Sequence, residues 1–202
     1  MALSLTSAPE TEPVTAAEAK DQLRVDVTDD DDWLNNFGIP TARRIAETFT
    51  HRALITQTWV LRLTGFGGRP IYLPRPPLVS ISTVAYTDSA GATQAWAESG
   101  TGYDLEQPTG EQALHASIRP AYGESYPSTR NEVDAVAITY VAGYGAASTV
   151  PVGIKHGILM LIADLYEQRR SEVLGTSRSK TYLTAESLLS PFRADRLDLR
   201  FD

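Results

Sequence analysis

The sequence predicts an α+β fold, and three observations support this prediction. Apolar residues recur with a helical period towards both ends of the 202-residue chain. In the middle the pattern changes to strand-like alternation, interrupted by turns rich in Gly, Pro and Ser. Neither helical part has enough elements to enclose a core alone. We therefore expect a small discontinuous helical core of residues 1–53 and 148–193, an inserted antiparallel β region of residues 54–147, and an extended C-terminal arm of residues 194–202.

The composition is that of an ordinary globular protein without cysteine. Hydrophobic residues make up 42% of the chain and charged residues 21%, so a packed core is feasible. No apolar run reaches the ~18 residues that cross a bilayer, and the start lacks a basic leader, so we expect neither a membrane partner nor secretion. The lack of cysteine excludes disulfides, thiolate metal sites and cysteine nucleophiles, and it fits a protein made in cytoplasm.

The net charge of −7 argues against a protein that grips nucleic acid by neutralising its phosphates. An acidic surface repels the DNA backbone, so the charge is compatible with DNA that slides past without sequence-specific binding. One basic cluster stands out, and it has two interpretations: a DNA-proximal surface, or a solvated helix end and loop, which we favour. It consists of Arg169, Arg170, Arg178 and Lys180.

The N-terminal residues predict an extended arm followed by a capped helix. The first thirteen residues are polar and contain two prolines, and the alternation of Leu3 and Leu5 hints at a strand. Thr15 and Glu18 have the spacing of a capping box, in which each side chain satisfies the other residue's backbone amide. We expect the helix to run from here to about Arg24.

A second helix is expected after the aspartate run "TDDDDW". Acidic residues are favoured at the positive N-terminal end of a helix. A calcium loop is the weaker interpretation, since it needs spaced ligands, a central Gly and a closing Glu, which are absent here. Gly38 and Pro40 predict a kink or break near residues 36–40, since proline removes an amide and crowds the preceding turn. His51 is expected after the helix end, in the left-handed conformation. The apolar face is expected to contain Leu34, Phe37, Thr41, Ile45 and Phe49.

Six stretches in the middle of the chain predict short antiparallel strands. Trp59, Leu61 and Leu63 share one face of the first. The prolines of "LPRPPL" suit strand ends or edge strands, because proline cannot donate to a central ladder. The stretches are "ITQTWVLRL", "PIYLP", "LVSISTVAY", "TQAWA", "ALHASI" and "AVAITYV".

The stretch "VPVGIKHGILMLIADLYEQRR" is the strongest predicted helix, and we expect the N-terminal helices to pack against it. Gly153 and Gly157 lie one turn apart on it and lower its helix propensity, so we expect a close approach by another helix there. The later stretch "YLTAESLLS" predicts a short helix that ends at Pro191.

The chain ends in a segment that alternates charged and apolar residues. Leu197, Leu199 and Phe201 would lie on one side of a strand, and Arg196 and Arg200 on the other. A strand needs a neighbour, and no second strand follows. We therefore expect this arm to add to a sheet edge of another chain, while a frayed tail that alternates by chance is the other interpretation.

Motifs that carry catalysis are missing from the sequence. His51, His115 and His156 occur in unrelated elements without metal-ligand spacing. "GFGGRP" and "AGYGAAS" are rich in Gly but lack the features of a phosphate loop, and there is no G-x-S-x-G elbow. We predict a protein that is not an enzyme and uses no metal or cofactor.

Several stretches, taken in order, resemble the head–tail connector proteins of tailed double-stranded DNA phages, also called adaptor or head-completion proteins. The resemblance covers residues ~14–193. Gly38 and Pro40 depart from the uninterrupted second helix usual in that family, and many members have Gly where His51 stands. The stretches are "RALITQTW", "IYLPRPPLVSISTVAYTDSAG", "IRPAYGESYPSTR", "AITYVAGYG", "VPVGIKHGILMLIADLYEQR" and "AESLLSPFR".

The resemblance implies a structural virion protein of the neck, made in the host cytoplasm. It implies a ring beneath the portal protein, of twelve copies if it matches the portal, that extends the DNA channel. The ring offers a platform to the next neck or tail component, a stopper or a tail terminator. The family implies no catalysis. By analogy, the C-terminal arm would dock on the portal or on a neighbouring subunit.

Two other functions are compatible with the residues alone. The β region could recognise a peptide or glycan, with the helices as scaffold. An enzyme with a site assembled from distant residues is the third hypothesis. A large cyclic oligomer, alone or with a portal, would favour the connector, whereas a strict monomer that ignores a portal would favour the binding module.

Overall fold

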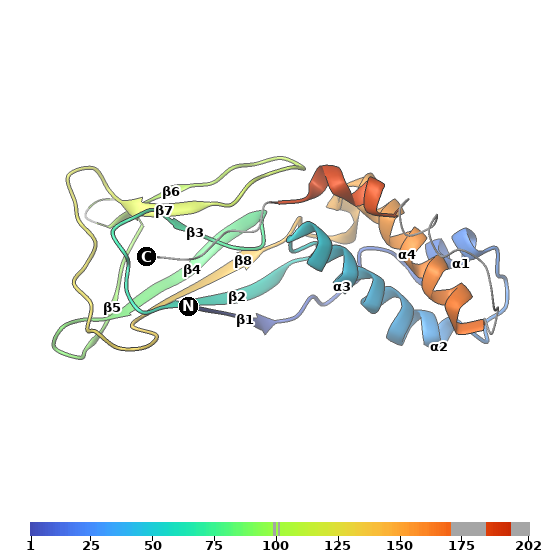
Figure 1. The fold of residues 1–202 in the computed structure, drawn as a ribbon, viewed down its shortest axis with the longest axis horizontal. Coiled ribbons are helices and arrows are strands. Elements are labelled where there is room, and N and C mark those ends of the chain that lie inside the picture. Colours follow the sequence, from blue (N-terminus) through green and yellow to red (C-terminus); the bar gives the residue numbers. More distant parts are fainter. Residues whose placement is uncertain (99, 101, 171–184, 195–202) are drawn as a thin grey trace.

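Helices and strands occupy opposite ends of an elongated molecule (Figure 1). The computed structural model describes residues 1–98, 100, 102–170 and 185–194. The predicted α+β class is confirmed, since helices and antiparallel sheets both occur in quantity. The helical end brings together segments from the start and the end of the chain, whereas the β end is built almost entirely from its middle.

The helices lie close to their predicted positions. A π-helical turn, Leu34–Gly38, joins α2 to α3, and a short helix at 185–189 continues into a 3₁₀ turn, Ser190–Phe192. A further 3₁₀ turn, Ala147–Thr149, precedes the last long helix. The α-helices are α1 (Ala16–Leu23), α2 (Asp31–Trp33), α3 (Ile39–Thr50) and α4 (Val152–Arg170).

The strands form two antiparallel sheets. The larger has the order β1-β2-β8-β4-β5, and the smaller has the order β3-β7-β6. Each of the six predicted stretches contains a strand, although His115 lies just before β7 rather than within it. The strand β6 was not predicted. The bounds are β1 (Ala2–Ser7), β2 (Gln57–Leu63), β3 (Ile71–Tyr72), β4 (Leu78–Thr87), β5 (Thr93–Ala95), β6 (Tyr103–Glu106), β7 (Ser117–Pro120) and β8 (Val136–Ala142).

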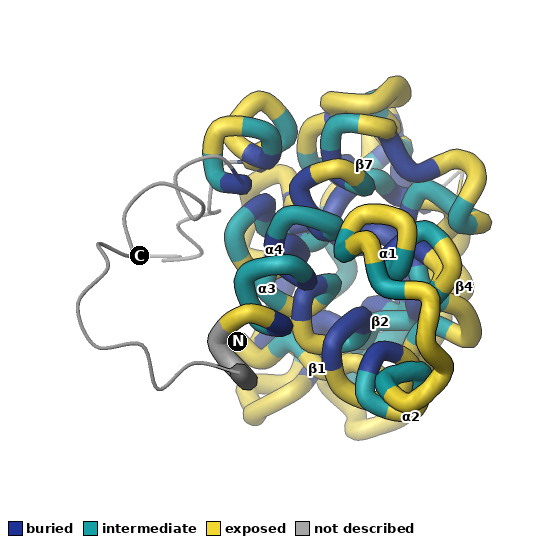
Figure 2. The backbone as a smooth tube through the Cα atoms, turned by 90° about the vertical axis from the view of Figure 1, so that its right-hand side faces the viewer, coloured by how far each residue is buried: buried dark blue, intermediate teal, exposed yellow. Residues whose placement is uncertain are grey.

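Two hydrophobic clusters correspond to the two ends of the molecule. The cluster of the β end lies between the sheets, and Leu61, Ile118 and Ile138 are fully buried in it. The cluster of the helical end packs α1 and α3 against α4, as predicted, through small and aliphatic side chains such as Ala46 and Ile158. Figure 2 views this end along the long axis and shows buried stretches between the helices, with α1 and α2 mostly intermediate or exposed.

The first strand joins the sheet and not the helical part of the chain. Leu3 pairs with Leu61 and Leu5 with Trp59, so the weak alternation at the N-terminus does form a strand. Leu3 packs against the cluster of the β end, which explains why the segment leaves the helices. The expectation that residues 1–53 all belong with the helical core is therefore wrong for residues 2–7.

The predicted kink or break before α3 takes the form of a π-helical turn. Pro40 lies in the first turn of α3, where its missing amide costs little. Gly38 lies under the ring of Trp33, since a Cβ at this position would be 2.8 Å from Trp33 Cζ3. Phe37 is 64% exposed and Thr41 is exposed too, so the prediction that both lie on the apolar face with Leu34 was wrong. The π turn adds a residue to the helical repeat, which changes the face on which the following residues lie.

The two helix-end predictions at the N-terminal half are confirmed. Thr15 and Glu18 form both hydrogen bonds of the capping box, and α1 ends at Arg24 in the left-handed conformation. His51 has a φ of 56° and closes α3 in the same way. Asp30 precedes α2 without a side-chain capping bond, but it accepts a hydrogen bond from the Tyr166 hydroxyl at 2.5 Å.

The glycine face of α4 is occupied by the C-terminal segment, as predicted. A Cβ on Gly153 would lie 2.8 Å from Phe192 Cε2, and a Cβ on Gly157 would lie 2.9 Å from Leu189 Cδ2. A side chain at either position would require Phe192 or Leu189 to shift. The glycines therefore let the helix at 185–189 and the following 3₁₀ turn lie directly on α4.

Candidate assembly surfaces

Most of the residues predicted to bind partners lie outside the described part of the chain. Arg169 and Arg170 are the last residues of α4, and their side chains are not among those described. The structure therefore does not test the predicted arm or the predicted basic cluster, and both stay predictions. The residues outside the description are Arg178, Lys180, Arg196, Leu197, Leu199, Arg200 and Phe201.

The point from which the C-terminal arm leaves the fold is described, and it is firmly anchored. The Ala194 amide donates to the Thr50 carbonyl at the end of α3 at 2.8 Å, and Ala194 is fully buried. The Arg193 guanidinium lies over the ring of Phe49, 5.7 Å from its centroid. Residue 194 thus belongs to the folded body, so the predicted arm can include only residues after it.

Arg52 ties this anchor to the β end. Its side chain is 1% exposed, donating from Nε to the Phe192 carbonyl and from Nη1 to the Ala113 carbonyl at 2.7 Å. Burial lowers the pKa of Arg52, while the nearby Tyr144 acts in the opposite direction. A guanidinium is the side chain best able to satisfy carbonyls in several directions at once. Arg52 therefore joins α3, the loop before β7 and the C-terminal segment.

A second buried group, Glu47 on α3, joins the helices to the sheet. Its carboxylate accepts from the Gln57 amide at 2.5 Å and from the Leu54 backbone amide at 3.2 Å. Arg43 donates to the same carboxylate at 3.0 Å, and Arg75 donates to the Glu47 carbonyl at 2.8 Å. These bonds span the joint between α3 and β2. They favour a fixed angle between the two ends, which a rigid building block of an assembly requires.

Sequence reasoning missed Arg52 and Glu47 because charged residues are ordinarily found at the surface. Each lies within a stretch that looks like an ordinary helix face or loop. The one available signal was position: Arg52 follows the helix-closing His51 and precedes the strand, where three segments converge.

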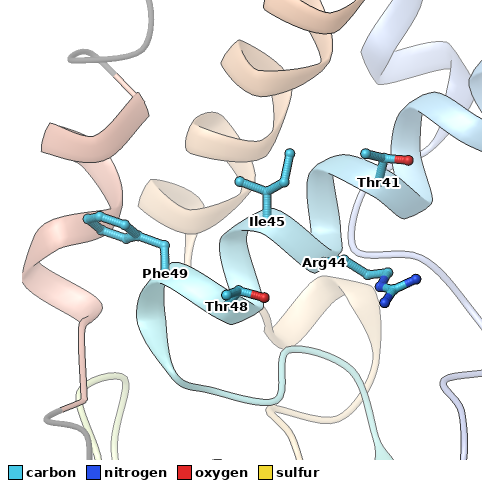
Figure 3. Close-up of a pocket in the computed structure, with 5 residues that line it drawn as sticks. All are labelled: Thr41, Arg44, Ile45, Thr48 and Phe49. Atoms are coloured by element: carbon cyan, nitrogen blue, oxygen red, sulfur yellow. The ribbon is translucent and has the colours of Figure 1, made fainter.

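The outward face of α3 carries a shallow apolar groove with a volume of about 410 Å³. Figure 3 shows its side chains in a row along α3, with Phe49 directed towards the C-terminal helical segment. The spacing follows successive helical turns, so the row forms one stripe. Ile45 and Phe49 provide the apolar floor, and Arg44 provides the charge. The groove is lined by Thr41, Arg44, Ile45, Thr48 and Phe49.

The outer face of the larger sheet forms a second surface, with almost no charge. Residues paired across the strands share a face, so the pairing identifies its members. Among the paired positions of β1, β2, β8 and β4 on this face, Arg62 is the one charged residue. The rows are Ala2, Arg62, Ala137 and Ala85; Ser4, Val60, Thr139 and Thr83; and Thr58, Val141 and Ser80. Depletion of charge is typical of the centre of a protein–protein contact.

The free edge of β1 is a third surface. In the described part of the chain β1 pairs with β2 alone, and its outer backbone groups are available to another strand. At the opposite edge β5 has only three residues, which gives an added strand little to pair with. Of the two edges, β1 is thus the better template for strand addition.

Comparisons with solved structures find proteins of the same architecture. Three matched chains come from the virion of a native gene transfer agent particle, the neck of an empty particle computed with C6 symmetry, and the neck of a native particle computed with C12 symmetry. Their TM-scores are 0.77, 0.76 and 0.71, at 23%, 23% and 22% sequence identity. Each match covers 100% of both chains. This chain shares their fold.

The likeness supports the connector resemblance at the level of fold, over the whole chain and not only its helices. Comparison with protein-family models finds no match, and neither does comparison with curated proteins. Within the described residues, no group of three or more His, Asp or Glu side chains could hold a metal ion. No helix described here is long and apolar enough to cross a membrane.

Proposed function

We propose that this protein is a structural head–tail connector of a tailed double-stranded DNA phage or a related particle. One observation carries the proposal: the fold matches, over its full length, chains from the necks of gene transfer agent particles, one of them computed with C12 symmetry. The buried bonds of Glu47 and Arg52 support it, because they give the subunit a fixed shape.

In this proposal the subunits form a ring of twelve beneath the portal, which extends the DNA channel. A closed ring needs two different contact faces on each subunit. The outer face of the larger sheet, where Arg62 is the one charged residue among the paired positions, and the exposed sides of the helices are suitable candidates. The helical core and the β insertion would act as two parts of one platform for a stopper or tail terminator. The net charge of −7 would let DNA pass without adhering.

The C-terminal arm is proposed to dock on the portal or on a neighbouring subunit as an added strand. Its support is the alternation of Leu197, Leu199 and Phe201, which would place three apolar side chains on one side. The anchor at Ala194 adds a reason, because it fixes the point from which the arm extends.

Native mass spectrometry of the chain mixed with the portal protein of its own particle tests the ring. The proposal expects a complex whose mass corresponds to twelve copies on one portal ring. Because connectors can be monomeric before assembly, the chain alone is only the reference sample. A chain that remains monomeric in the presence of an intact portal would contradict the proposal.

Deletion of residues 195–202 tests the arm. The cut leaves Ala194 in place, so its hydrogen bond to Thr50 and the fold should persist. Portal binding, measured by sedimentation, should weaken. A matched control replaces Asp198 and Asp202 by Asn, which keeps the alternation and length of the arm. Equal portal binding by the truncated and full chains would refute arm docking and leave the ring proposal standing.

A further inference from the structure

The groove on α3 lies where the folded body ends and the arm begins. The Ala194 amide is bonded to the carbonyl of Thr50, the last residue of α3, and Phe49 is the neighbouring end of the groove. The Arg193 guanidinium lies over the Phe49 ring, 5.7 Å from its centroid. The next residue of the chain therefore starts at one end of an apolar groove that no described segment fills.

The length of the arm matches the groove. From Thr50 to Thr41 the helix rises about 14 Å, at about 1.5 Å per residue. Eight residues follow Ala194, and an extended chain covers about 3.3 Å per residue, or roughly 26 Å in all. Leu197 would then fall about 10 Å along the path, beside Arg44 and Ile45, and Leu199 about 17 Å along it, just past Thr41.

The chemistry of the arm also matches. The groove has an apolar floor of Ile45 and Phe49, and Arg44 stands at its side. An arm that lays Leu197 beside Ile45, with Leu199 at the far end of the groove, has Asp198 on its other side, beyond which Asp202 follows. An aspartate close to Arg44 gains a favourable charge contact at the rim, where such pairs contribute specificity more than affinity.

We propose that, in the free subunit, residues 195–202 lie in the α3 groove of the same chain. The arm runs back along α3 with Leu197 in the groove, Leu199 at its far end and Asp198 beside Arg44. The groove then covers the apolar side of the arm until a better partner is present, which limits premature pairing of an unprotected alternating strand. This inference goes beyond the ring proposal, since it concerns the chain before assembly.

Paramagnetic relaxation in solution tests the proposal directly. The chain has no cysteine, so Arg200→Cys provides a single attachment site for a nitroxide label on the full-length protein. The backbone amides of α3 from Thr41 to Phe49 are expected to relax strongly. An arm attached near Thr50 would cause some relaxation without docking, so a control of the same length is required.

The control carries Leu197→Ser and Leu199→Ser together with the same label. It keeps the tether and the charge but loses the apolar side of the arm, so the docked population should fall about tenfold. A second variant, Arg44→Glu, should lower it by a smaller factor. Equal relaxation of α3 in the labelled chain and the serine control would overturn the proposal.

A mixture of isotope-labelled chain without nitroxide and unlabelled chain with nitroxide separates the possible arrangements. Docking within one chain predicts no relaxation of α3 in the isotope-labelled copies. Relaxation in those copies would show that a second subunit supplies the arm, and it would overturn docking within the same chain. Neither experiment contains a portal, so their failure would leave the ring proposal untouched.

Discussion

The two ends of the molecule are stabilised in different ways. At the β end, large aromatic rings fill the space between the sheets: Phe66 lies 5.0 Å from Trp96 and 5.3 Å from Tyr126, measured between ring centroids. At the helical end, the buried contacts are made by Ala, Leu and Ile side chains, and aromatic residues such as Phe49 are only partly buried. The β end comes from one nearly continuous stretch plus β1, whereas the helical end combines three distant segments.

The difference indicates that the two ends have different roles in the molecule. An aromatic cluster assembled from neighbouring strands can hold its shape without help from the chain ends. The helical end depends on close approach, and on buried polar bonds to segments far away in the sequence. It is also the end from which the C-terminal arm departs. We therefore expect substitutions at the helical end to affect the arm, and substitutions at the β end to affect stability alone.

Replacing Trp96 by Ala should have the largest effect. The side chain is 6% exposed and contacts Phe66, Tyr103 and Tyr126, so the free energy of unfolding should fall by about 3–5 kcal/mol. Urea unfolding followed by circular dichroism measures it. Tyr122→Ala, at a fully exposed ring, is the control, with a change within about 0.5 kcal/mol. A much smaller fall in the free energy of unfolding would show that the aromatic cluster is not what stabilises the β end.

Replacing Arg52 by Met should lower the unfolding free energy by about 3 kcal/mol, because the buried carbonyls of Phe192 and Ala113 lose their donor. The effect should be regional as well. Hydrogen exchange should accelerate most in residues 185–194, which Arg52 holds against α3. Arg62→Met, on the exposed face of β2, is the matched control. Unchanged hydrogen exchange in residues 185–194 would show that Arg52 does not hold this segment against α3.

Replacing Gly157 by Val should cost about 1–3 kcal/mol, since the new methyl groups push against Leu189. His156→Val introduces the same residue at the neighbouring, exposed position of α4 and serves as the control. Thermal unfolding of the two variants measures the difference. Equal stability would mean that the C-terminal segment moves away freely, and the helical end would then not depend on close approach.

Replacing Glu18 by Gln should have the smallest effect, at about 1 kcal/mol or less, because the capping box and the Lys155 bond at 2.8 Å lie near the surface. The hydrogen bond from Lys155, followed by that from the Thr15 backbone, lowers the pKa of Glu18. A lowered carboxyl pKa stabilises the fold above the pKa of a free glutamate, and this contribution is lost as pH falls through the lowered value.

The difference between wild type and Glu18→Gln should therefore shrink as the pH is lowered from about 6 to about 3. Urea midpoints at several pH values, compared for the two proteins, give this difference. A gap that is constant with pH would attribute the effect to helix propensity and not to the ionised carboxylate.

The sequence predicted correctly those features that depend on residues close to one another in the chain. The capping box of Thr15 and the left-handed His51 depend on near neighbours in the sequence, and each is found as predicted. The close approach at the glycine face of α4 is also found, although its partners Leu189 and Phe192 are distant in the sequence and were not identified. Strand positions followed from alternation and turns. The missed strand β6, "YDLE", is short and half charged, so its pattern resembles a loop.

Features that depend on distant partners could not be predicted in the same way. Six alternating residues at the N-terminus show that a strand can form, but they do not identify β2 as its neighbour. Phe37 looked like a core residue because its period was counted without a π turn. Arg52 and Glu47 carry charges that usually mark a surface, and only the convergence of three segments explains their burial.

The central claim is that this chain forms a ring on a portal. A low-resolution electron cryomicroscopy image of the chain bound to the portal of its own particle tests it most directly. The account predicts a twelve-fold ring of elongated subunits beneath the portal, around an open axial channel. Particles in which the portal carries no added ring, at chain concentrations well above saturation, would contradict it.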